Sequence, residues 1–208
     1  MAVDRGRTGA YGQDREPTLV DRFGVWLSGR AVRRHAELAG KRVGDFGCGF
    51  QASFARSVLG EVASMTLVDL SLADDLKADK RVRALEGPLP ETLAHIEDAS
   101  LDVVLCLSVL EHLSEPQRML AEIHRLSAPG GVALINVPTW RGKTMLELSA
   151  FRLGWSPAEE MDDHKRYYDP RELWPMLVEA GWRPSAIRVR RHKFTLNTFA
   201  VCRVPAAE

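Results

Sequence analysis

Strand-like and helix-like segments alternate through most of the chain, and this alternation is the feature that most limits its fold. The clearest strand is the run at 101–110, which is almost wholly apolar, as expected for a strand covered on both faces. Further strands are predicted at 41–47, 64–70, 80–87 and 132–138. Such alternation favours a doubly wound, mostly parallel α/β sheet with helices on both faces.

Helix signals lie between the predicted strands. Apolar residues at three- and four-residue spacing predict a helix over 18–38. Ser114, Pro116 and Gln117 are residue types that begin helices, so a longer helix is expected to start there. The stretch at 169–182 has an N-cap acid, a first-turn proline, a capping-box glutamate and a closing glycine, so it predicts a well-defined helix.

The end of the chain breaks the alternation. Two strands are predicted near 184–191 and 194–204 with no helix between them, so they should pair antiparallel. The sheet is therefore expected to have seven strands, with an antiparallel final strand. Residues 139–168 lack a regular period, which is typical of an insert that covers an active site. We expect residues 1–40 to form a tail and a cover or lid helix, and 41–208 the main domain.

Composition argues against several classes of protein. The chain has 208 residues, of which 45% are hydrophobic, and this suits one domain with its own core. Lys plus Arg and Asp plus Glu both number 28, so bulk charge does not indicate a nucleic-acid or membrane partner. The N-terminus lacks the apolar core of a signal peptide, and no apolar run approaches the ~20 residues of a membrane span. Three widely spaced cysteines favour free thiols in a reducing cytoplasm.

A glycine-rich turn between a strand and a helix is the strongest indication of a ligand site. In VGDFGCGFQASF the strand ends in Asp45, and Gly47 and Gly49 follow before a short predicted helix. The pattern G-x-G-x-x-A also occurs in dinucleotide-binding proteins, so NAD is one candidate. Asp45 would repel a pyrophosphate, however, and suits a cofactor with an amino group and a positive centre. Asp69, at the end of the second strand, could accept ribose hydroxyls with either cofactor.

The chain resembles the class I S-adenosylmethionine-dependent methyltransferases, which have a small Rossmann-like domain. The resemblance covers about residues 40–204. It rests on four blocks in order: VGDFGCGFQA, MTLVDLS, LDVVLCLSVLEHL with EIHRLSAPGGVALINVP, and DDHKRYYDPRELWPMLVEAGW. It implies that the protein binds S-adenosylmethionine and releases S-adenosylhomocysteine.

The resemblance also implies which residues bind the cofactor. The methionine part would lie against the glycine loop, the ribose and adenine beside the second strand, and the methyl group above the end of the fourth. The corresponding residues are Asp45, Gly47, Cys48 and Gly49, then Asp69 and Leu70, then Ser108. The chain departs from the family pattern where Phe50-Gln51 replaces a third glycine, and where no Asp follows the third strand. The backbone of Gly87–Leu89 would then contact adenine through Gly87 and Leu89.

Two histidines are candidates for a catalytic base. Methyl transfer is an in-line displacement, and a hydroxyl acceptor needs a base within about 3 Å of its proton. His164 is the favoured base, with Asp162 or Asp163 orienting its ring. His112, at the start of the segment after the fourth strand, is the alternative. No cluster of metal ligands can be drawn, so no metal is expected.

Neighbouring residues indicate the acceptor. Glu111, Trp140, Arg166 and Tyr167 are candidates for binding a small polar or sugar-like molecule, so O-methylation of such a molecule or a glycan is the leading hypothesis. LSVLEH replaces the Asn/Asp-Pro-Pro-aromatic turn of nucleic-acid amino methyltransferases, so nucleic acid is not expected. The basic stretch at 183–204 either attracts an anionic substrate or forms the solvated face of a strand pair. An NAD-binding oxidoreductase and a cofactor-binding subunit without activity remain alternatives, and the protein is expected to be a monomer or homodimer.

Overall fold

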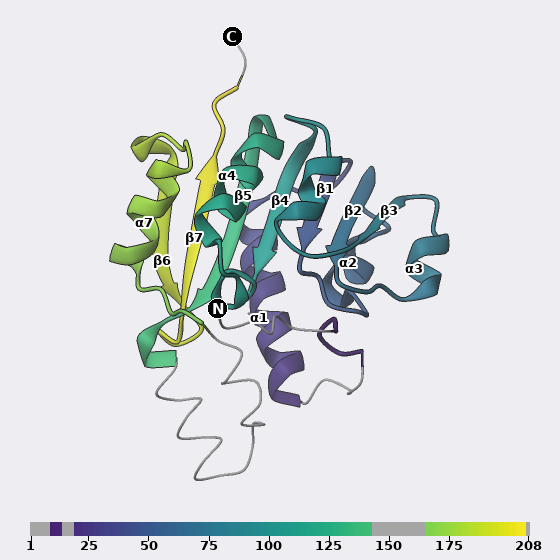
Figure 1. Ribbon diagram of the computed structural model, residues 1–208, viewed down its shortest axis with the longest axis horizontal. Coiled ribbons are helices and arrows are strands. Elements are labelled where there is room, and N and C mark those ends of the chain that lie inside the picture. The colour runs from purple at the N-terminus through teal and green to yellow at the C-terminus, as the bar shows by residue number, and fades with distance from the viewer. Residues whose placement is uncertain (1–8, 14–18, 143–164, 207–208) are drawn as a thin grey trace, which may run out of the picture.

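The computed structural model of the protein describes residues 9–13, 19–142 and 165–206. Its centre is a seven-stranded sheet between two layers of helices (Figure 1). The strands are β1 (Arg42–Phe46), β2 (Ser64–Asp69), β3 (Val82–Glu86), β4 (Leu101–Leu107), β5 (Ser127–Pro138), β6 (Ile187–His192) and β7 (Asn197–Arg203). They lie in the order β3-β2-β1-β4-β5-β7-β6, and every neighbouring pair is parallel except the two that include β7. The expected mostly parallel sheet with an antiparallel final strand is confirmed.

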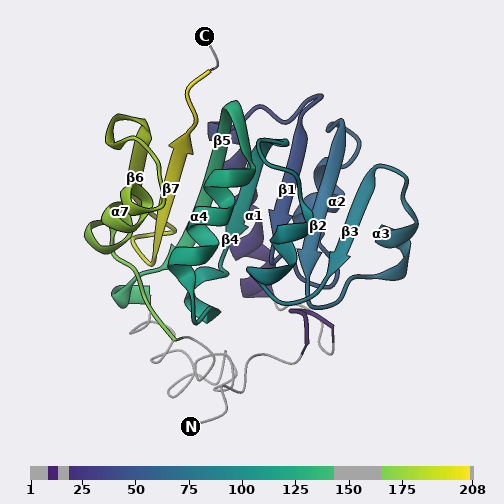
Figure 2. The ribbon, with the colours of Figure 1, turned by 45° about the horizontal axis from the view of Figure 1, so that its top comes forward.

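Helices cover both faces of this sheet (Figure 2). One face packs against α1 (Leu19–His35), α2 (Ser53–Val58) and α3 (Asp74–Ala78), and the other against α4 (Pro116–Leu126), α7 (Pro170–Glu179) and the short helices η1 (Glu91–His95) and η2 (Leu110–His112). A third short helix, η3 (Pro184–Ala186), precedes β6. None of the described helices has the length and apolar character needed to span a bilayer.

Strand β4 contributes to the core on both of its faces. Val104 and Cys106 pack with the layer of α4 and α7, whereas Val103 and Leu105 pack with the layer of α1 and α2. All four side chains are buried, so the prediction of a strand covered on both sides is confirmed. The strand ends at Leu107, earlier than its apolar pattern, because the chain turns there toward η2. The residues after it therefore lie at the carboxyl edge of the sheet.

The start of α4 differs from the prediction. The helix begins at Pro116 with Glu115 at the N-cap, so Ser114 does not cap it. Gln117 also makes no capping box, because its side-chain amide donates a 2.9 Å hydrogen bond to the carbonyl of Met176. A residue type that suits a helix start is here used to tie α4 to α7.

The helix predicted at 169–182 is confirmed as α7. The backbone N–H of Asp169 donates to the Glu172 carboxylate at 2.7 Å, and Gly181 follows the helix with φ 115°. Left-handed backbone at this point is a common way to end a helix, and glycine adopts it without strain. The first helix is shorter than expected, since α1 ends at His35 and not at Leu38.

The connection between β6 and β7 lies later in the chain than predicted. β6 continues through His192, and the turn occupies 193–196 instead of 191–193. Lys193, Phe194 and Thr195 all have positive φ, at 46°, 57° and 72°. Residues with a Cβ rarely adopt this conformation, so the turn holds strained backbone at the carboxyl edge of the sheet.

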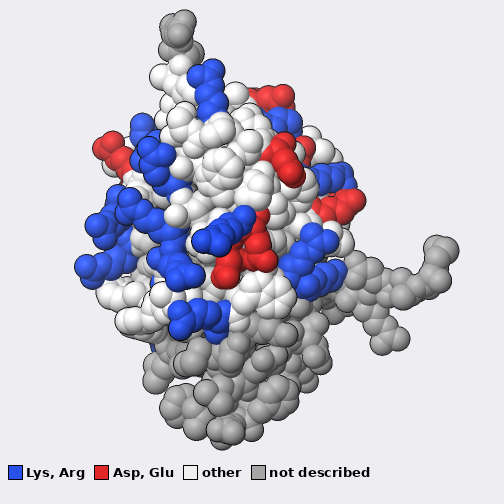
Figure 3. All heavy atoms as spheres, turned by 90° about the vertical axis from the view of Figure 1, so that its left-hand side faces the viewer, with Lys and Arg blue, Asp and Glu red and all other residues white. Residues whose placement is uncertain are grey.

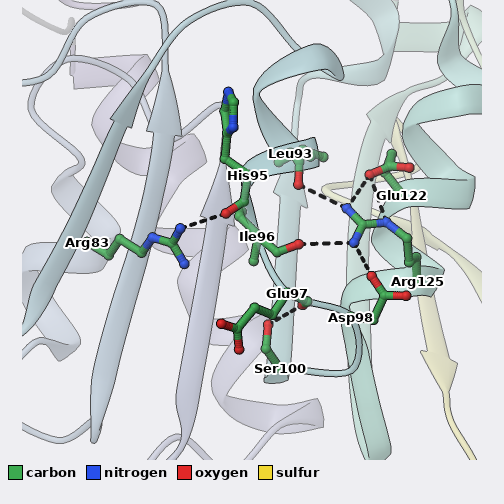
Figure 4. A network of polar contacts seen from close by, with 9 residues as sticks. All are labelled: Arg83, Leu93, His95, Ile96, Glu97, Asp98, Ser100, Glu122 and Arg125. Carbon is green, nitrogen blue, oxygen red and sulfur yellow. Dashed lines mark hydrogen bonds and ion pairs between the residues drawn. The ribbon is translucent and has the colours of Figure 1, made fainter.

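One arginine holds the segment after β3 against α4. The Arg125 guanidinium donates to the carbonyls of Leu93 (2.9 Å) and Ile96 (3.0 Å) and pairs with the carboxylates of Asp98 and Glu122 (Figure 4). A carbonyl oxygen has two lone pairs, so the Leu93 carbonyl can accept from Arg125 as well as from the N–H of Ile96. Arg125 therefore positions η1 and, with it, the loop that leads to η1 from β3.

The edge of the sheet formed by β6 is basic. Arg188, Arg190 and Arg191 are exposed on this strand, and Lys and Arg side chains are spread over the face that it shares with α7 (Figure 3). Charged side chains on an edge strand hinder pairing with another chain. This placement favours the solvated-face interpretation of the basic stretch.

Candidate active site

The glycine loop after β1 lies at the carboxyl edge of the sheet and is built for close approach. Gly47 has φ 72°, and a Cβ added there would lie 2.3 Å from Cγ2 of Val109. Gly49 has φ 76°, and its Cβ would lie 3.1 Å from the carbonyl oxygen of Tyr11. Glycine is required at Gly47 for both conformation and space. The absence of a side chain at both glycines lets Val109 and Tyr11 approach the backbone of this loop.

Asp69, at the end of β2, is tied directly to the glycine loop. The backbone N–H of Gly49 donates to Oδ2 of Asp69 at 2.7 Å, and the N–H of Leu70 donates to Oδ1 at 2.8 Å. Cys48, which is half-buried between Gly47 and Gly49, has its sulfur 3.9 Å from the carbonyl of Val68. The structure thus brings together most of the residues predicted for the methionine and ribose parts of the cofactor.

Asp45 is a buried acid beside the same loop. Its side chain is 4% exposed, and burial followed by the negative charge of Asp69 raises its pKa to about 7. None of the described residues donates a hydrogen bond to its carboxylate. Two acids that repel each other favour a positively charged ligand, because its charge would stabilise both ionised forms. The pair fits the cationic cofactor that the sequence indicated.

Ser108 follows β4 in a conformation that suits a functional position. Its φ is 60°, and its N–H donates to the carbonyl of Asn136 at 2.7 Å, while the Asn136 amide donates to the Ser108 hydroxyl at 3.3 Å. Asn136 is fully buried on β5, and its Oδ1 has no partner among the described residues. Strained backbone with an unpaired polar atom is typical of a binding site. Asn136 was not foreseen, because it stands inside an apolar strand.

The loop after β3 is tied to the end of β2 at the same edge of the sheet. Gly87 has φ 154°, its N–H donates to the carbonyl of Asp69 at 2.9 Å, and a Cβ would lie 2.5 Å from Oγ1 of Thr92. Leu89 is half-buried against the core. Of the two residues predicted for adenine, Gly87 therefore lies next to Asp69 at the end of β2, and Leu89 packs against the core two residues later.

An N-terminal segment crosses the glycine loop. The carbonyl of Tyr11 accepts a 2.9 Å hydrogen bond from the N–H of Phe50, and Ala10 is buried. This contact was not predicted, because the segment is Gly-rich and charged and gives no periodic signal.

The helix α1 makes an ion pair with the segment after α2. Its Arg33 pairs with Glu61 at 2.8 Å, whereas the side chain of Trp26 on the same helix is exposed.

Glu111 is the most deeply buried charged residue near the end of β4. Its side chain is 1% exposed, and burial raises its pKa to about 8. Its Oε2 has no hydrogen-bond partner among the described residues, although the charge of Lys193 acts on it. The backbone carbonyl of Glu111 accepts from the N–H of Lys165 at 2.8 Å, so the segment that starts α7 runs beside η2.

A cavity of about 350 Å³ lies where this segment meets α7. Its lining includes three predicted substrate residues, Trp140, Arg166 and Tyr167, and adds Lys165, Tyr168, Glu172 and Met176. The rings of Trp140 and Tyr167 are 5.4 Å apart, and the Trp140 indole N–H donates to the Glu172 carboxylate at 3.2 Å. The fourth predicted residue, Glu111, does not line the cavity, although its backbone carbonyl accepts from Lys165, which does.

The structure describes one of the two histidines predicted as bases. His112 is half-buried on η2, directly after Glu111. His164 and Asp163 lie outside the described residues, so their role stays a prediction. Within the described ranges, no group of three or more His, Cys, Asp or Glu residues could hold a metal ion. Asp102 instead pairs with Arg42 at 2.8 Å, at the opposite edge of the sheet.

Comparison with known proteins decides the family. A family model described as a methyltransferase domain matches residues 21–186. The chain belongs to the methyltransferase-domain family. It is a class I S-adenosylmethionine-dependent methyltransferase. Of the two cofactor hypotheses drawn from the sequence, this finding favours S-adenosylmethionine over NAD. The cofactor of the protein is S-adenosylmethionine, and the buried acid Asp45 and the carboxylate of Asp69 beside the glycine loop fit that molecule.

Relatives of this methyltransferase carry a more specific name. A ubiquinone biosynthesis O-methyltransferase of Idiomarina loihiensis is 33% identical over 75% of this chain and 68% of its own length. A protein of the same name from Neisseria meningitidis is 28% identical over 81% of this chain and 74% of its own. A solved S-adenosylmethionine-dependent methyltransferase from Archaeoglobus fulgidus has a TM-score of 0.62 at 16% identity, with 86% of this chain and 93% of that one covered, so it shares the fold.

Proposed function

We propose that this methyltransferase transfers the methyl group to a hydroxyl on the ring of a small acceptor. The proposal rests on the cavity in which the rings of Trp140 and Tyr167 lie beside Lys165 and Arg166. Its volume of about 350 Å³ falls within the usual range of small-molecule sites. Aromatic side chains pack against flat faces, and cationic groups suit an acceptor with a negative or strongly polar substituent.

The names of the relatives support a ring hydroxyl over a sugar hydroxyl. Both reported relatives are O-methyltransferases of ubiquinone biosynthesis, and a quinone is built on a flat six-membered ring. The sugar-like or glycan acceptor expected from sequence stays the alternative. A cytoplasmic location and a monomeric or homodimeric state also remain predictions.

The chain's own residues have separate tasks in this reaction. When bound, the cofactor supplies an electrophilic methyl group on a positively charged sulfur. Asp45 and Asp69 provide negative charge beside the glycine loop, Asp69 also accepts the N–H of Gly49, and Ser108 forms the floor beneath the reacting atoms. We propose His164, oriented by Asp163, as the base that takes the hydroxyl proton, with His112 as the alternative.

The acceptor class is tested with labelled methyl groups. Purified protein is incubated with methyl-labelled S-adenosylmethionine and, separately, with catechol, 4-hydroxybenzoate and methyl α-glucoside. We expect label on a ring hydroxyl of the aromatic compounds. Label on the glucoside alone would indicate a sugar acceptor and not an aromatic ring. The absence of label from all three compounds would contradict the proposed acceptor class.

The base is tested by substitution. His164→Ala is expected to lower kcat by about 10²- to 10⁴-fold, because the hydroxyl would lose its proton acceptor. S-adenosylhomocysteine affinity, measured by calorimetry, should be unchanged. His95→Ala is a matched control, because His95 is exposed on η1, away from the cavity. An unchanged rate for His164→Ala together with loss in His112→Ala would move the role to His112.

A further inference from the structure

One residue of the cavity wall carries a buried hydroxyl that has no hydrogen-bond partner among the described residues. In this part of the chain five buried side-chain polar atoms lack a partner, and they belong to Glu111, Asn136, Tyr168, Trp182 and His192. Of these five residues, Tyr168 is the one that lines the cavity beside α7. Buried polar groups are almost always hydrogen-bonded, and a place for a ligand is one explanation of an exception. Tyr168 therefore has an unused hydrogen bond in the wall of a cavity of small-molecule size.

The ends of two strands fix the backbone of Tyr168. Its N–H donates to the carbonyl of Pro138 on β5 at 2.9 Å, and its carbonyl accepts from the hydroxyl of Thr198 on β7 at 2.7 Å. Thr198 is fully buried, and Tyr168 is 4% exposed and belongs to the core cluster that α4 and α7 share. A binding site needs side chains that packing and hydrogen bonds hold in place. Tyr168 has this support from two separate strands.

The chemistry of the neighbouring groups indicates what the hydroxyl would bind. Burial raises the pKa of Tyr168 above its ordinary value, so at neutral pH the hydroxyl keeps its proton and can donate it to a hydrogen bond. Arg166 lines the same cavity and opposes this rise, although no hydrogen bond joins the two side chains. A guanidinium carries donors and no acceptor. The complementary ligand group is therefore an oxygen that accepts hydrogen bonds.

Resting on the proposed function, we propose that Tyr168 is a specificity-determining residue, whose hydroxyl donates a hydrogen bond to an oxygen of the methyl acceptor other than the hydroxyl that receives the methyl group. The rings of Trp140 and Tyr167 can pack against the flat face of any aromatic compound, so they do not select among its substituents. A site that hydrogen-bonds a substrate group discriminates against the analogue that lacks this group. Tyr168 would provide that discrimination.

Binding to the complex with S-adenosylhomocysteine tests the hydrogen bond without turnover. Calorimetry measures the affinities of phenol, catechol and 4-hydroxybenzoate for the wild type and for Tyr168→Phe. The wild type should bind catechol or 4-hydroxybenzoate about three- to tenfold more tightly than phenol, the factor of one net hydrogen bond. Tyr168→Phe should lose this preference and keep its affinity for phenol. An unchanged preference in Tyr168→Phe, or no preference in the wild type, would overturn the inference.

Thermal melting distinguishes a binding role of the hydroxyl from a structural one. Tyr168→Phe keeps the ring and removes a hydroxyl that has no partner in the described part of the chain, so its Tm should equal or exceed that of the wild type. A lower Tm would mean that the hydroxyl bonds within the protein, and would overturn the inference. Ser127→Ala is the matched control, because the buried hydroxyl of Ser127, at the other end of β5, donates to the carbonyl of Ile123 at 2.7 Å. This variant should lose stability and keep the preference.

Turnover separates this inference from the proposed function. With catechol as acceptor, Tyr168→Phe should lose kcat/KM mainly through a higher KM, because the hydrogen bond is made in the ground state as well as in the transition state. A wild type that shows the binding preference but transfers no methyl group to a ring hydroxyl would contradict the proposed function and leave the role of Tyr168 standing. Transfer to phenol and catechol with equal kcat/KM in both proteins would support the proposed function and overturn this inference.

Discussion

The backbone N–H of Gly49 and Oδ2 of Asp69 are joined by a 2.7 Å hydrogen bond. The bond links the loop after β1 to the end of β2, which are neighbours in the sheet but 20 residues apart in the chain. The other carboxylate oxygen, Oδ1, accepts from the backbone N–H of Leu70. Asp69 therefore orients both the loop after β1 and the residue that follows β2. The shape of the cleft therefore depends on Asp69 before any ligand binds.

Replacement of this acid should weaken cofactor binding. Asp69→Asn keeps the size of the side chain but loses its charge and one acceptor for the backbone N–H groups. Hydrogen bonds to charged groups contribute about 1.5–3 kcal/mol, so S-adenosylhomocysteine affinity should fall roughly 10- to 100-fold in calorimetry. Asp75→Asn is the control, because Asp75 forms only an exposed pair with Arg56. Equal affinities of Asp69→Asn and wild type would contradict the role of Asp69.

The glycine loop should not tolerate a methyl group. Gly47→Ala combines a φ of 72° with a Cβ 2.3 Å from Val109, so either the loop or Val109 must shift. We expect a loss of roughly 1–3 kcal/mol in the free energy of unfolding and no measurable S-adenosylhomocysteine binding. Gly60→Ala, where a Cβ meets nothing within 4 Å, should melt like the wild type. Double substitution with Val109→Ala should restore part of the stability, because it removes the clash and leaves the strained φ.

Protonation of Asp45 should make stability depend on pH. Its pKa is raised from 3.8 to about 7 in the folded protein by burial and by the charge of Asp69. Between these values the folded state holds a proton that the unfolded chain has released, so the free energy of unfolding should fall as pH rises, by up to about 1.4 kcal/mol per pH unit. Denaturant titrations of the cofactor-free protein from pH 4 to 7 measure this slope.

Asp45→Asn should flatten that dependence, because the amide does not titrate. Glu111, whose pKa is also raised by burial, acts with the same sign, so part of the slope should remain. The thiols of Cys48 and Cys106 and the carboxylate of Asp69 are the other titratable groups that interact with Asp45 among the described residues. Affinity for S-adenosylmethionine should rise through pH 7 in the wild type, as Asp45 ionises. An identical pH profile for Asp45→Asn would exclude it as the titrating group.

The contact between Tyr11 and Phe50 should slow release of the cofactor. The Tyr11 carbonyl accepts the Phe50 N–H, and a Cβ on Gly49 would meet the same carbonyl. Deletion of residues 1–13 should speed the dissociation of S-adenosylhomocysteine by up to about tenfold. This factor corresponds to the net free energy of one hydrogen bond, about 0.5–1.5 kcal/mol. Stopped-flow measurements should show no change after deletion of residues 1–8. A faster release in both deletions would mean that the effect does not come from Tyr11.

Much of the cofactor cleft could be predicted from sequence because its signals are local. A strand ending in Asp45, glycines directly after it and an acid at the end of the next strand lie within short stretches, and parallel strands bring their carboxyl ends to one edge. Helix and strand boundaries were less predictable. Gln117 suited a helix cap, for example, but a carbonyl on α7 offered its amide a better-placed partner than the start of its own helix.

The acceptor side was much less predictable. The cavity joins Trp140, which follows β5, to Tyr167 and Tyr168, which precede α7, and no short sequence pattern indicates that these segments meet. The burial of Glu111 and Asn136 likewise depends on elements that are distant in the chain. Burial and opposing charges are properties of the assembled site, so no short sequence pattern reports them.

By itself, the sequence determined the order of strands and helices along the chain, the glycine loop and the two acids at the ends of neighbouring strands, since each depends on periodicity or on neighbouring residues. Only the tertiary structure decided that Tyr11 contacts the loop, that Trp140 and Tyr167 share a cavity, and that Glu111 is buried with an unpaired carboxylate oxygen among the described residues. These relationships join residues from separate elements. They arise when the sheet and its helices pack, because packing sets the distances and the loss of solvent that give such pairs their properties.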